Sequence, residues 1–170
     1  NQSVGMRFNG LTIPKGASIL AASIQFQVDE VNSGATSVTI QGENADNAST
    51  FSSSNGNISA RPRTLAAVPW SPVPWTSVGV AGPDQKTPDL SSIIQEVVNR
   101  PGWSSGNSLA VIVTGSGERT AESFNGQSAA APLLHVKYGT GTGTGTGNQA
   151  PQAHISAPAD GAAFNSGDTI

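Results

Sequence analysis

The stretch "ASIQFQVD" at residues 22–29 decides the fold class, because polar and apolar side chains alternate along it. Ile24, Phe26 and Val28 share one face, and the serine and the glutamines between them share the other. A period of two residues is typical of a β-strand with one buried face and one solvated face. The stretch therefore predicts a strand at the surface of a β-sheet protein.

The same alternation recurs in "SVGMRF" at residues 3–8 and in "TSVTIQGE" at residues 36–43. "SLAVIVTG" at residues 108–115 is more continuously apolar, which predicts a central strand buried on both faces. "PLLHVKY" at residues 132–138 predicts a last strand. Turns rich in proline and glycine separate the first strands. Together these patterns predict an all-β, antiparallel sandwich.

One segment has helical rather than strand periodicity. "TPDLSSIIQEVVNRPGW" at residues 87–103 places Leu90, Ile93, Ile94, Val97 and Val98 on one helical face. We predict a short helix at about residues 88–99 that closes one open end of the sandwich. Thr87 is the expected N-cap, Pro88 the expected first helical residue, and Pro101-Gly102 the expected stop signal.

The middle of the chain, residues 43–88, is long, polar and rich in proline, and it holds two of the three tryptophans. Loops of this length are usually functional or disordered. Large aromatic side chains normally find packing partners, which argues against disorder here. We therefore expect an ordered excursion across one face or rim of the sandwich.

Composition limits the classes of partner. Eight basic and eleven acidic residues give a formal net charge of −3, and they form no charged runs. This balance does not favour nucleic acid or an anionic membrane as a partner. The sequence contains no cysteine, and no apolar run approaches the roughly 20 residues that span a bilayer. Polarity comes from Ser, Thr, Asn, Gln and Gly, a balance common in extracellular bacterial β-proteins.

Four motifs in the second half of the chain resemble the DNRLRE domain of large secreted bacterial proteins. They are "DLSSIIQEVVN" (89–99), "GWSSGNSLAVIV" (102–113), "AES" (121–123) and "APLLHVKY" (131–138). The resemblance covers residues 3–138. It implies a jelly-roll-like β-sandwich without catalytic activity, and some relatives are treated as carbohydrate-binding modules of polysaccharide-degrading enzymes. It also implies that the chain begins at the second strand of such a domain.

The end of the chain predicts a different organisation. After the sandwich at residues 1–138, glycine and threonine alternate in a segment that we interpret as a linker at residues 139–150. Residues 151–170 resemble the first strand and turn of a bacterial immunoglobulin-like domain. We therefore expect a multidomain parent protein that is extracellular or at the cell surface, with neighbouring domains of the same chain as partners.

The sequence lacks a recognisable catalytic set, so we do not expect an enzyme. The histidines are His135, expected to face solvent on a strand, and His154 in the tail. Glu118 and Glu122 would be the candidate carboxylate pair of a glycosidase, but across a turn they are better interpreted as surface charges.

A glycan-binding site is the first candidate site, formed by Trp75, Trp70, Arg61 and Arg63. Aromatic rings stack on the apolar faces of sugars, and arginines pair with carboxylated or sulfated sugars. The alternative is that both tryptophans pack the long segment onto the sandwich. Trp103, directly after the helix stop, is expected to be a packing residue.

A structural calcium ion is the second candidate ligand. Glu43, Asp46 and Asn47 lie in one expected loop, and Asp84 and Asp89 lie in another. Oxygen atoms from loops are the ligands that calcium takes. The alternative is that these are ordinary turn residues, because no known ligand spacing is present. No other cofactor is expected.

Two functions follow from this reading. The first is a non-catalytic module that binds polysaccharide or a cell-surface glycan for its parent protein. The second is a structural subunit of an adhesin or extracellular fibre. In that case an unpaired edge strand could pair with copies of the same chain, or with the tail "QAHISAPADG".

Overall fold

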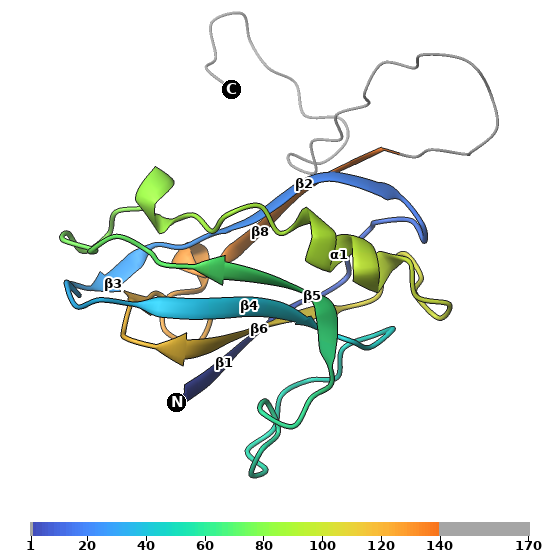
Figure 1. Ribbon diagram of the computed structural model, residues 1–170, viewed down its shortest axis with the longest axis horizontal. Helices are drawn as coiled ribbons and strands as arrows, with labels where there is room; N and C mark the ends of the chain where they lie inside the picture. The colour runs from blue at the N-terminus through green and yellow to red at the C-terminus, as the bar shows by residue number, and fades with distance from the viewer. Residues whose placement is uncertain (1, 140–170) are drawn as a thin grey trace, which may run out of the picture.

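A computed structural model describes residues 2–139 of the protein (Figure 1). Within these residues the strands are β1 (Gln2–Phe8), β2 (Ser18–Gln25), β3 (Val28–Glu30), β4 (Ser37–Glu43), β5 (Arg63–Trp70), β6 (Leu109–Ser116), β7 (Thr120–Ala121) and β8 (Leu133–Gly139). The helical elements are the α-helix α1 (Ser91–Val98) and the short 3₁₀ helices η1 (Pro83–Gln85) and η2 (Ser128–Ala130).

The strands form one large sheet and two small ones, and every pairing is antiparallel. The large sheet has the strand order β1-β6-β4-β5, and the small sheets are β2-β8 and β3-β7. Residues from the inner faces of both kinds of sheet, such as Ile40 of β4 and Ile24 of β2, belong to one hydrophobic core. The predicted all-β antiparallel sandwich is therefore confirmed.

The stretch at residues 22–29 contributes to two strands rather than one. β2 pairs with β8, the chain leaves that ladder at Phe26, and β3 pairs with β7. The apolar alternation continues through the break, because Ile24, Phe26 and Val28 are 0%, 8% and 0% exposed. The prediction of the buried face was correct, whereas the periodicity contained no sign of the change of partner strand.

β6 is the central strand that its apolar sequence predicts. It lies between β1 and β4, and its first four residues, Leu109–Ile112, are at most 1% exposed. On β8, Leu134, Val136 and Tyr138 pack against the core, as predicted, while His135 faces solvent. Trp103 is a packing residue, since it is 1% exposed and its Nε1 donates to the carbonyl of Ile13 at 3.0 Å.

The predicted helix is present as α1, and its apolar face is buried against β2, β4 and β5 (Figure 1). All five predicted apolar residues are at most 1% exposed. Gly42 of β4 lets the helix approach, because a Cβ there would lie 3.0 Å from Ile93 Cγ2. The helix closes the space between β5 and β2.

The predicted start of the helix was wrong. The N-cap is Leu90, and it makes no side-chain capping bond. Thr87 Oγ1 instead accepts from the amide of Ile24, and Asp89 Oδ1 accepts from the amide of Ala22. Both side chains are thus occupied by the edge of β2, so the helix begins only at Ser91.

The segment at residues 43–88 is ordered, as expected, but it contains the strand β5, which the sequence reading missed. β5 lies at the margin of the large sheet, where Pro69 is tolerated because its missing N–H is not needed by a partner strand. Leu65, on the outer face of β5, is 95% exposed. The strand therefore lacks the usual alternation of buried apolar and exposed polar residues. The segment before β5, residues 44–62, is called the 44–62 loop below.

The domain boundaries can be compared with the structure at one position. β8 ends at Gly139, one residue beyond the predicted end of the sandwich at residue 138. The predicted linker from residue 140 to 150 and the immunoglobulin-like segment at residues 151–170 lie outside the described residues. Among residues 2–139, no helix is long and apolar enough to cross a membrane.

Candidate functional site

The two tryptophans of the predicted glycan site pack beside Phe26. The ring centroids of Phe26 and Trp70 are 5.8 Å apart and the rings are stacked, while those of Phe26 and Trp75 are 6.1 Å apart and tilted. Trp75 is 1% exposed, and its Nε1 donates to the carbonyl of Asp84 at 3.3 Å. Trp75 therefore has the packing role, and its ring offers no face to a sugar.

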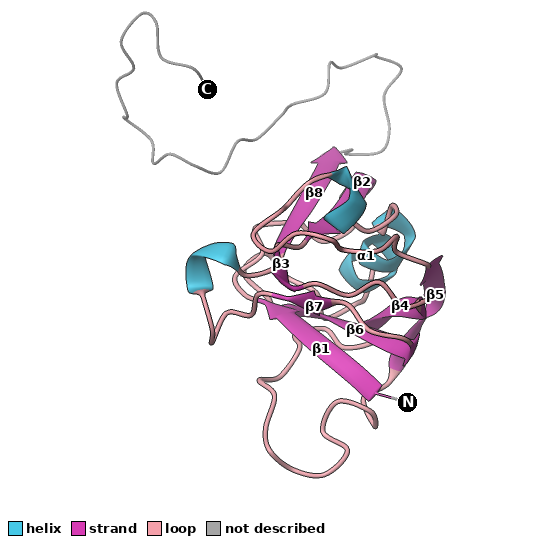
Figure 2. Ribbon diagram, turned by 90° about the vertical axis from the view of Figure 1, so that its left-hand side faces the viewer, coloured by secondary structure: helices cyan, strands magenta, loops and turns pink. Residues whose placement is uncertain are grey.

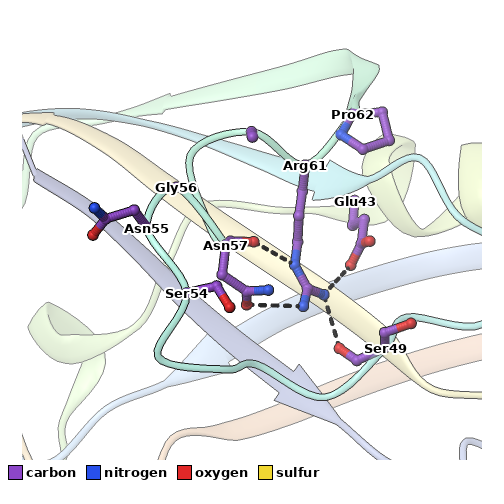
Figure 3. A pocket seen from close by; sticks show the side chains of 9 residues that line it. Glu43, Ser49, Ser54, Asn55, Gly56, Asn57, Arg61 and Pro62 are labelled. Atoms are coloured by element: carbon purple, nitrogen blue, oxygen red, sulfur yellow. Dashed lines mark hydrogen bonds and ion pairs between the residues drawn. The ribbon is translucent and has the colours of Figure 1, made fainter.

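Arg61 lies at the centre of the 44–62 loop (Figure 3). Its guanidinium donates five hydrogen bonds, which equals the number of N–H donors of this side chain. The acceptors are the carbonyl and Oδ1 of Asn57 at 2.9 and 3.2 Å, Glu43 Oε2 at 2.7 Å, and the carbonyls of Ser49 and Thr50 at 2.8 and 3.1 Å.

The ion pair between Arg61 and Glu43 is nearly buried. The two side chains are 8% and 9% exposed. Because all five donors of Arg61 have acceptors within the protein, no donor is left for a carboxylated or sulfated sugar. Arg61 holds the 44–62 loop in place, and the structure does not support its predicted role as a ligand-binding residue.

Arg63 also bonds to the 44–62 loop. Its guanidinium donates to the carbonyls of Arg61 at 2.8 Å and Ile58 at 3.2 Å. Partial burial lowers the pKa of Arg63, and the nearby carboxylate of Glu43 opposes this by raising it. The side chain ties the first residue of β5 to the turn that precedes it.

The arginines and tryptophans of the predicted site do not come together. Arg63 begins β5 and Trp70 ends it, which places their backbones about 23 Å apart at roughly 3.3 Å per residue. One sugar cannot contact Trp70 and the arginine pair at the same time. The residues Trp75, Trp70, Arg61 and Arg63 therefore do not form one compact sugar site, because the strand that separates the arginines from the tryptophans is extended.

An aromatic contact that sequence reasoning missed fixes the 44–62 loop to β1. The ring of Phe51 covers Gly5, so that a Cβ at this glycine would lie 2.6 Å from Phe51 Cζ. The guanidinium carbon of Arg61 lies 4.4 Å from the centroid of the same ring, in cation–π geometry. Gly5, Phe51 and Arg61 therefore form one stack on the outer face of the large sheet.

A polar hollow of about 440 Å³ opens beside this stack. Its lining includes Glu43, Ser49, Asn57 and Arg61, whose polar atoms bond to one another (Figure 3). In Figure 3, Asn55 lies away from the guanidinium, whereas Ser54 lies beside Asn57. A second hollow, of about 330 Å³, lies between the turn at Pro74 and the 3₁₀ helix η1 and includes Asp84.

The acidic residues predicted to bind calcium are separated, and three have other partners. Glu43 pairs with Arg61, and Asp46 Oδ1 accepts from Arg100 Nε at 2.8 Å. Asp84 lies in η1, and Asp89 precedes α1. Within residues 2–139, no group of three His, Cys, Asp or Glu side chains could hold a metal ion. The predicted acidic residues thus do not form one cluster. Arginines or hydrogen-bond donors of the fold contact Glu43, Asp46 and Asp89, and Asn47 Oδ1 accepts from the amide of Ser108.

The carboxylate of Asp89 has a lowered pKa. A hydrogen bond from the Ser91 hydroxyl and bonds from the amides of Ala22 and Ser91 lower the pKa of Asp89. Each of these donors favours the ionised carboxylate. The side chain thereby serves as a fixed acceptor for the edge of β2.

The remaining arginines also bond within the fold. Arg7 Nε donates to the carbonyl of Ala48 at 2.7 Å, and Arg100 donates to Asp46 and Asn44. Arg119 bonds to several segments at once: to the carbonyls of Val73 at 2.9 Å, Gly34 at 2.8 Å and Pro72 at 2.9 Å, and to Thr36 Oγ1 at 2.7 Å. Isolated arginines in polar loops gave no sequence signal for these roles.

The residues considered for catalysis are spread over the surface. Glu118 is exposed in the turn after β6, Glu122 is half-buried after β7, and His135 is exposed on β8. Neither carboxylate has a described hydrogen bond from its side chain to the other. The exposed position of Glu118 is the one expected for a surface charge, whereas Glu122 is partly buried.

No family model, curated protein or solved structure matches this chain. The resemblance to the DNRLRE domain therefore rests on the quoted sequence motifs.

Proposed function

We propose that this protein contributes a non-catalytic structural module to a larger extracellular bacterial protein. The supporting observation is that all five arginines, Arg7, Arg61, Arg63, Arg100 and Arg119, donate hydrogen bonds to the module's own loops. These are the side chains best suited to recognise an anionic ligand. Their use inside the fold favours rigidity of the loops over recognition of a ligand.

The tryptophans support the same proposal. Trp75 and Trp103 are each 1% exposed, so they add buried apolar area to the core. Glycan recognition needs an accessible aromatic face. Two of the three tryptophans in the sequence have none.

Glycan binding is the second candidate, and Trp70 favours it. This residue is partly exposed at the end of β5. Its ring stacks on that of Phe26, with 5.8 Å between the ring centroids. A supported, partly open indole could stack on a neutral sugar without any arginine.

Binding to insoluble polysaccharides and to a glycan array distinguishes the two candidates. We expect the full 170-residue chain to bind no more glycan than an unrelated β-sandwich of similar charge. Trp70→Ala should change nothing, and Trp75→Phe is the matched control for loss of a buried indole. Glycan binding that Trp70→Ala abolishes and Trp75→Phe retains would establish the second candidate instead.

Limited proteolysis tests the structural role directly. The 44–62 loop is long and polar, so an untethered loop of this kind would be cut first. We expect it to resist cleavage in the native chain and to become the first cleavage site in Arg61→Ala. Rapid cleavage of the native loop would contradict the proposal that the arginines make it rigid.

A further inference from the structure

The outer edge of β5 is protected against pairing with another strand. The carboxylate of Glu96 on α1 accepts from the amides of Leu65 and Ala66, both at 2.8 Å. Pro69, further along the strand, has no amide hydrogen to offer. Proline and acceptor side chains at an edge are devices by which β-proteins avoid edge-to-edge association.

The edge of β2 is covered by the segment that leads into α1. The amide of Phe26 donates to the carbonyl of Gln85 at 3.0 Å, and the amides of Ile24 and Ala22 donate to Thr87 Oγ1 and Asp89 Oδ1. β8, on the far side of β2, carries the exposed side chains of His135 and Lys137. A lysine on an edge strand discourages strand addition.

β1 has no comparable protection among the described residues. It pairs on one side with β6, and no backbone hydrogen bond from residues 3–8 to any other described segment is present. Val4 is 52% exposed, and Met6 and Phe8 are only partly buried against the core. In Figure 2, β1 lies at the front of the molecule, at the margin of its sheet.

The single charge on β1 does not block this edge. The guanidinium of Arg7 is held by Ala48, Asn9 and Ser108. The 44–62 loop covers the outer face of the strand through Phe51, and no backbone hydrogen bond between this loop and β1 is present among the described residues. β1 is therefore an edge strand of seven residues whose apolar side chains are partly exposed.

We propose that β1 pairs antiparallel with β1 of a second copy of this chain. With Gly5 opposite Gly5 of the second copy, all seven residues pair, and inner faces meet inner faces. Val4 then lies opposite Met6, and Ser3 lies opposite Arg7 of the other copy. About Gly5, the apolar residues Val4 and Met6 thus oppose each other twice, Gln2 lies opposite Phe8, and no like charges are opposed.

This pairing joins two four-stranded sheets across a two-fold axis. Because the same patch is used on both copies, the contact closes after two chains. The inference goes beyond the proposed structural role, because it names the surface and the partner. Its readout is the oligomeric state, so its failure and the failure of the structural role are separate outcomes.

Opposite charge changes at Ser3 test the register. We expect sedimentation equilibrium of the full chain to show a dimer whose population rises with concentration. Ser3→Glu places a carboxylate opposite Arg7 of the other copy and should tighten the dimer. Ser3→Lys opposes two cations and should weaken it. Because each dimer contains two such pairs, the expected change is roughly 2- to 30-fold in the dissociation constant in each direction.

His135→Glu and His135→Lys on the exposed face of β8 are the matched controls, and neither should alter the dimer. Hydrogen exchange should show that amides of β1 become protected as concentration rises. A monomer up to about 1 mM protein would overturn the inference. So would a dimer that responds equally to both Ser3 variants, because the contact would then lie elsewhere in the chain.

Discussion

At the scale of single residues, arginine is the side chain that organises the loops. The sequence contains no cysteine, so disulfides cannot hold its long connections. Arg61 binds several backbone carbonyls of its own loop, and Arg119 binds carbonyls of segments that are distant in sequence. A guanidinium stays charged at every physiological pH, and its fork of donors fits several acceptors at once.

Removing the guanidinium of Arg61 should lower the stability of the fold. Arg61→Ala leaves the nearly buried carboxylate of Glu43 without its cation, and we expect a loss of about 3–5 kcal/mol in the free energy of unfolding. Arg61→Lys keeps the charge but not the five donors, so it should lose about half as much. Urea unfolding measures both, and a loss below about 0.5 kcal/mol for Arg61→Ala would show that the loop is held by other contacts.

Asp89 gives the fold a defined response to acid. Its pKa is lower in the folded protein than in the unfolded chain, so its contribution to stability is present above the unfolded pKa of about 3.9. That contribution is lost as pH falls through the folded pKa.

Asp89→Asn keeps an acceptor for the amide of Ala22 but cannot ionise. We therefore expect the stability difference between the native chain and this variant to be constant near neutral pH and to shrink below about pH 4. Urea unfolding across this pH range is the measurement. A difference that stays the same down to pH 2 would assign the acid response to other carboxylates.

At the scale of elements, α1 and the segment before it stabilise the edges of β2 and β5. α1 buries its apolar face against β2, β4 and β5, and its Glu96 also satisfies amides of β5. The segment before it uses Thr87 and Asp89 as acceptors for β2. The helix α1 and the segment before it thus supply hydrogen-bond acceptors to the edges of β5 and β2, where no further described strand pairs.

Glu96→Ala tests this role. The amides of Leu65 and Ala66 would lose their shared acceptor, which is worth about 1–3 kcal/mol for a charged partner. We expect a lower urea midpoint together with a greater tendency to aggregate, measured by light scattering, because the edge of β5 becomes available. Ser92→Ala, on the same helix, is the control, and an equal effect of both variants would exclude a specific role for Glu96.

At the scale of the whole molecule, one hydrophobic core and ion pairs between charged side chains stabilise the described part of the chain. Glu43 and Asp46 are neutralised by Arg61 and Arg100. The carboxylates that could have bound an ion are therefore already compensated within the fold.

Calcium should accordingly have no effect on stability. We expect the same midpoint of thermal unfolding in excess EDTA and in millimolar calcium, measured by circular dichroism or calorimetry. A bound ion would raise the midpoint as its concentration rises above its dissociation constant. Such an increase, absent with magnesium, would mean that calcium binds through residues other than the predicted cluster.

Much of the fold could be predicted because burial leaves a periodic trace in the sequence. The alternation at Ile24, Phe26 and Val28 and the helical spacing at Ile93 and Val97 each identified a buried face correctly. β5 was missed because its exposed positions include an apolar residue and a proline. Such an edge strand lacks the alternation of apolar and polar residues from which strands are predicted.

The candidate site was predicted less well, because spacing along the chain does not reveal distance in space. Arg63 and Trp70 are close in sequence, but an extended strand places them at opposite ends. Arg61 and Glu43 are 18 positions apart, yet they form a nearly buried pair. Which partner a polar side chain finds depends on the path of the loop, and composition alone does not encode that path.

The topology of the sheets has a consequence for how the chain reaches its native state. β1 pairs with β6, β2 with β8, and β3 with β7, so each of these ladders joins the first part of the sequence to the last. Contacts of such long sequence separation make folding slow, because a large loop must close before any of them forms. During synthesis, β1 to β3 have no partner strands until residues beyond 108 have emerged from the ribosome. The early part of the chain therefore stays without its partner strands until then, and the sandwich forms only after β6, β7 and β8 are released.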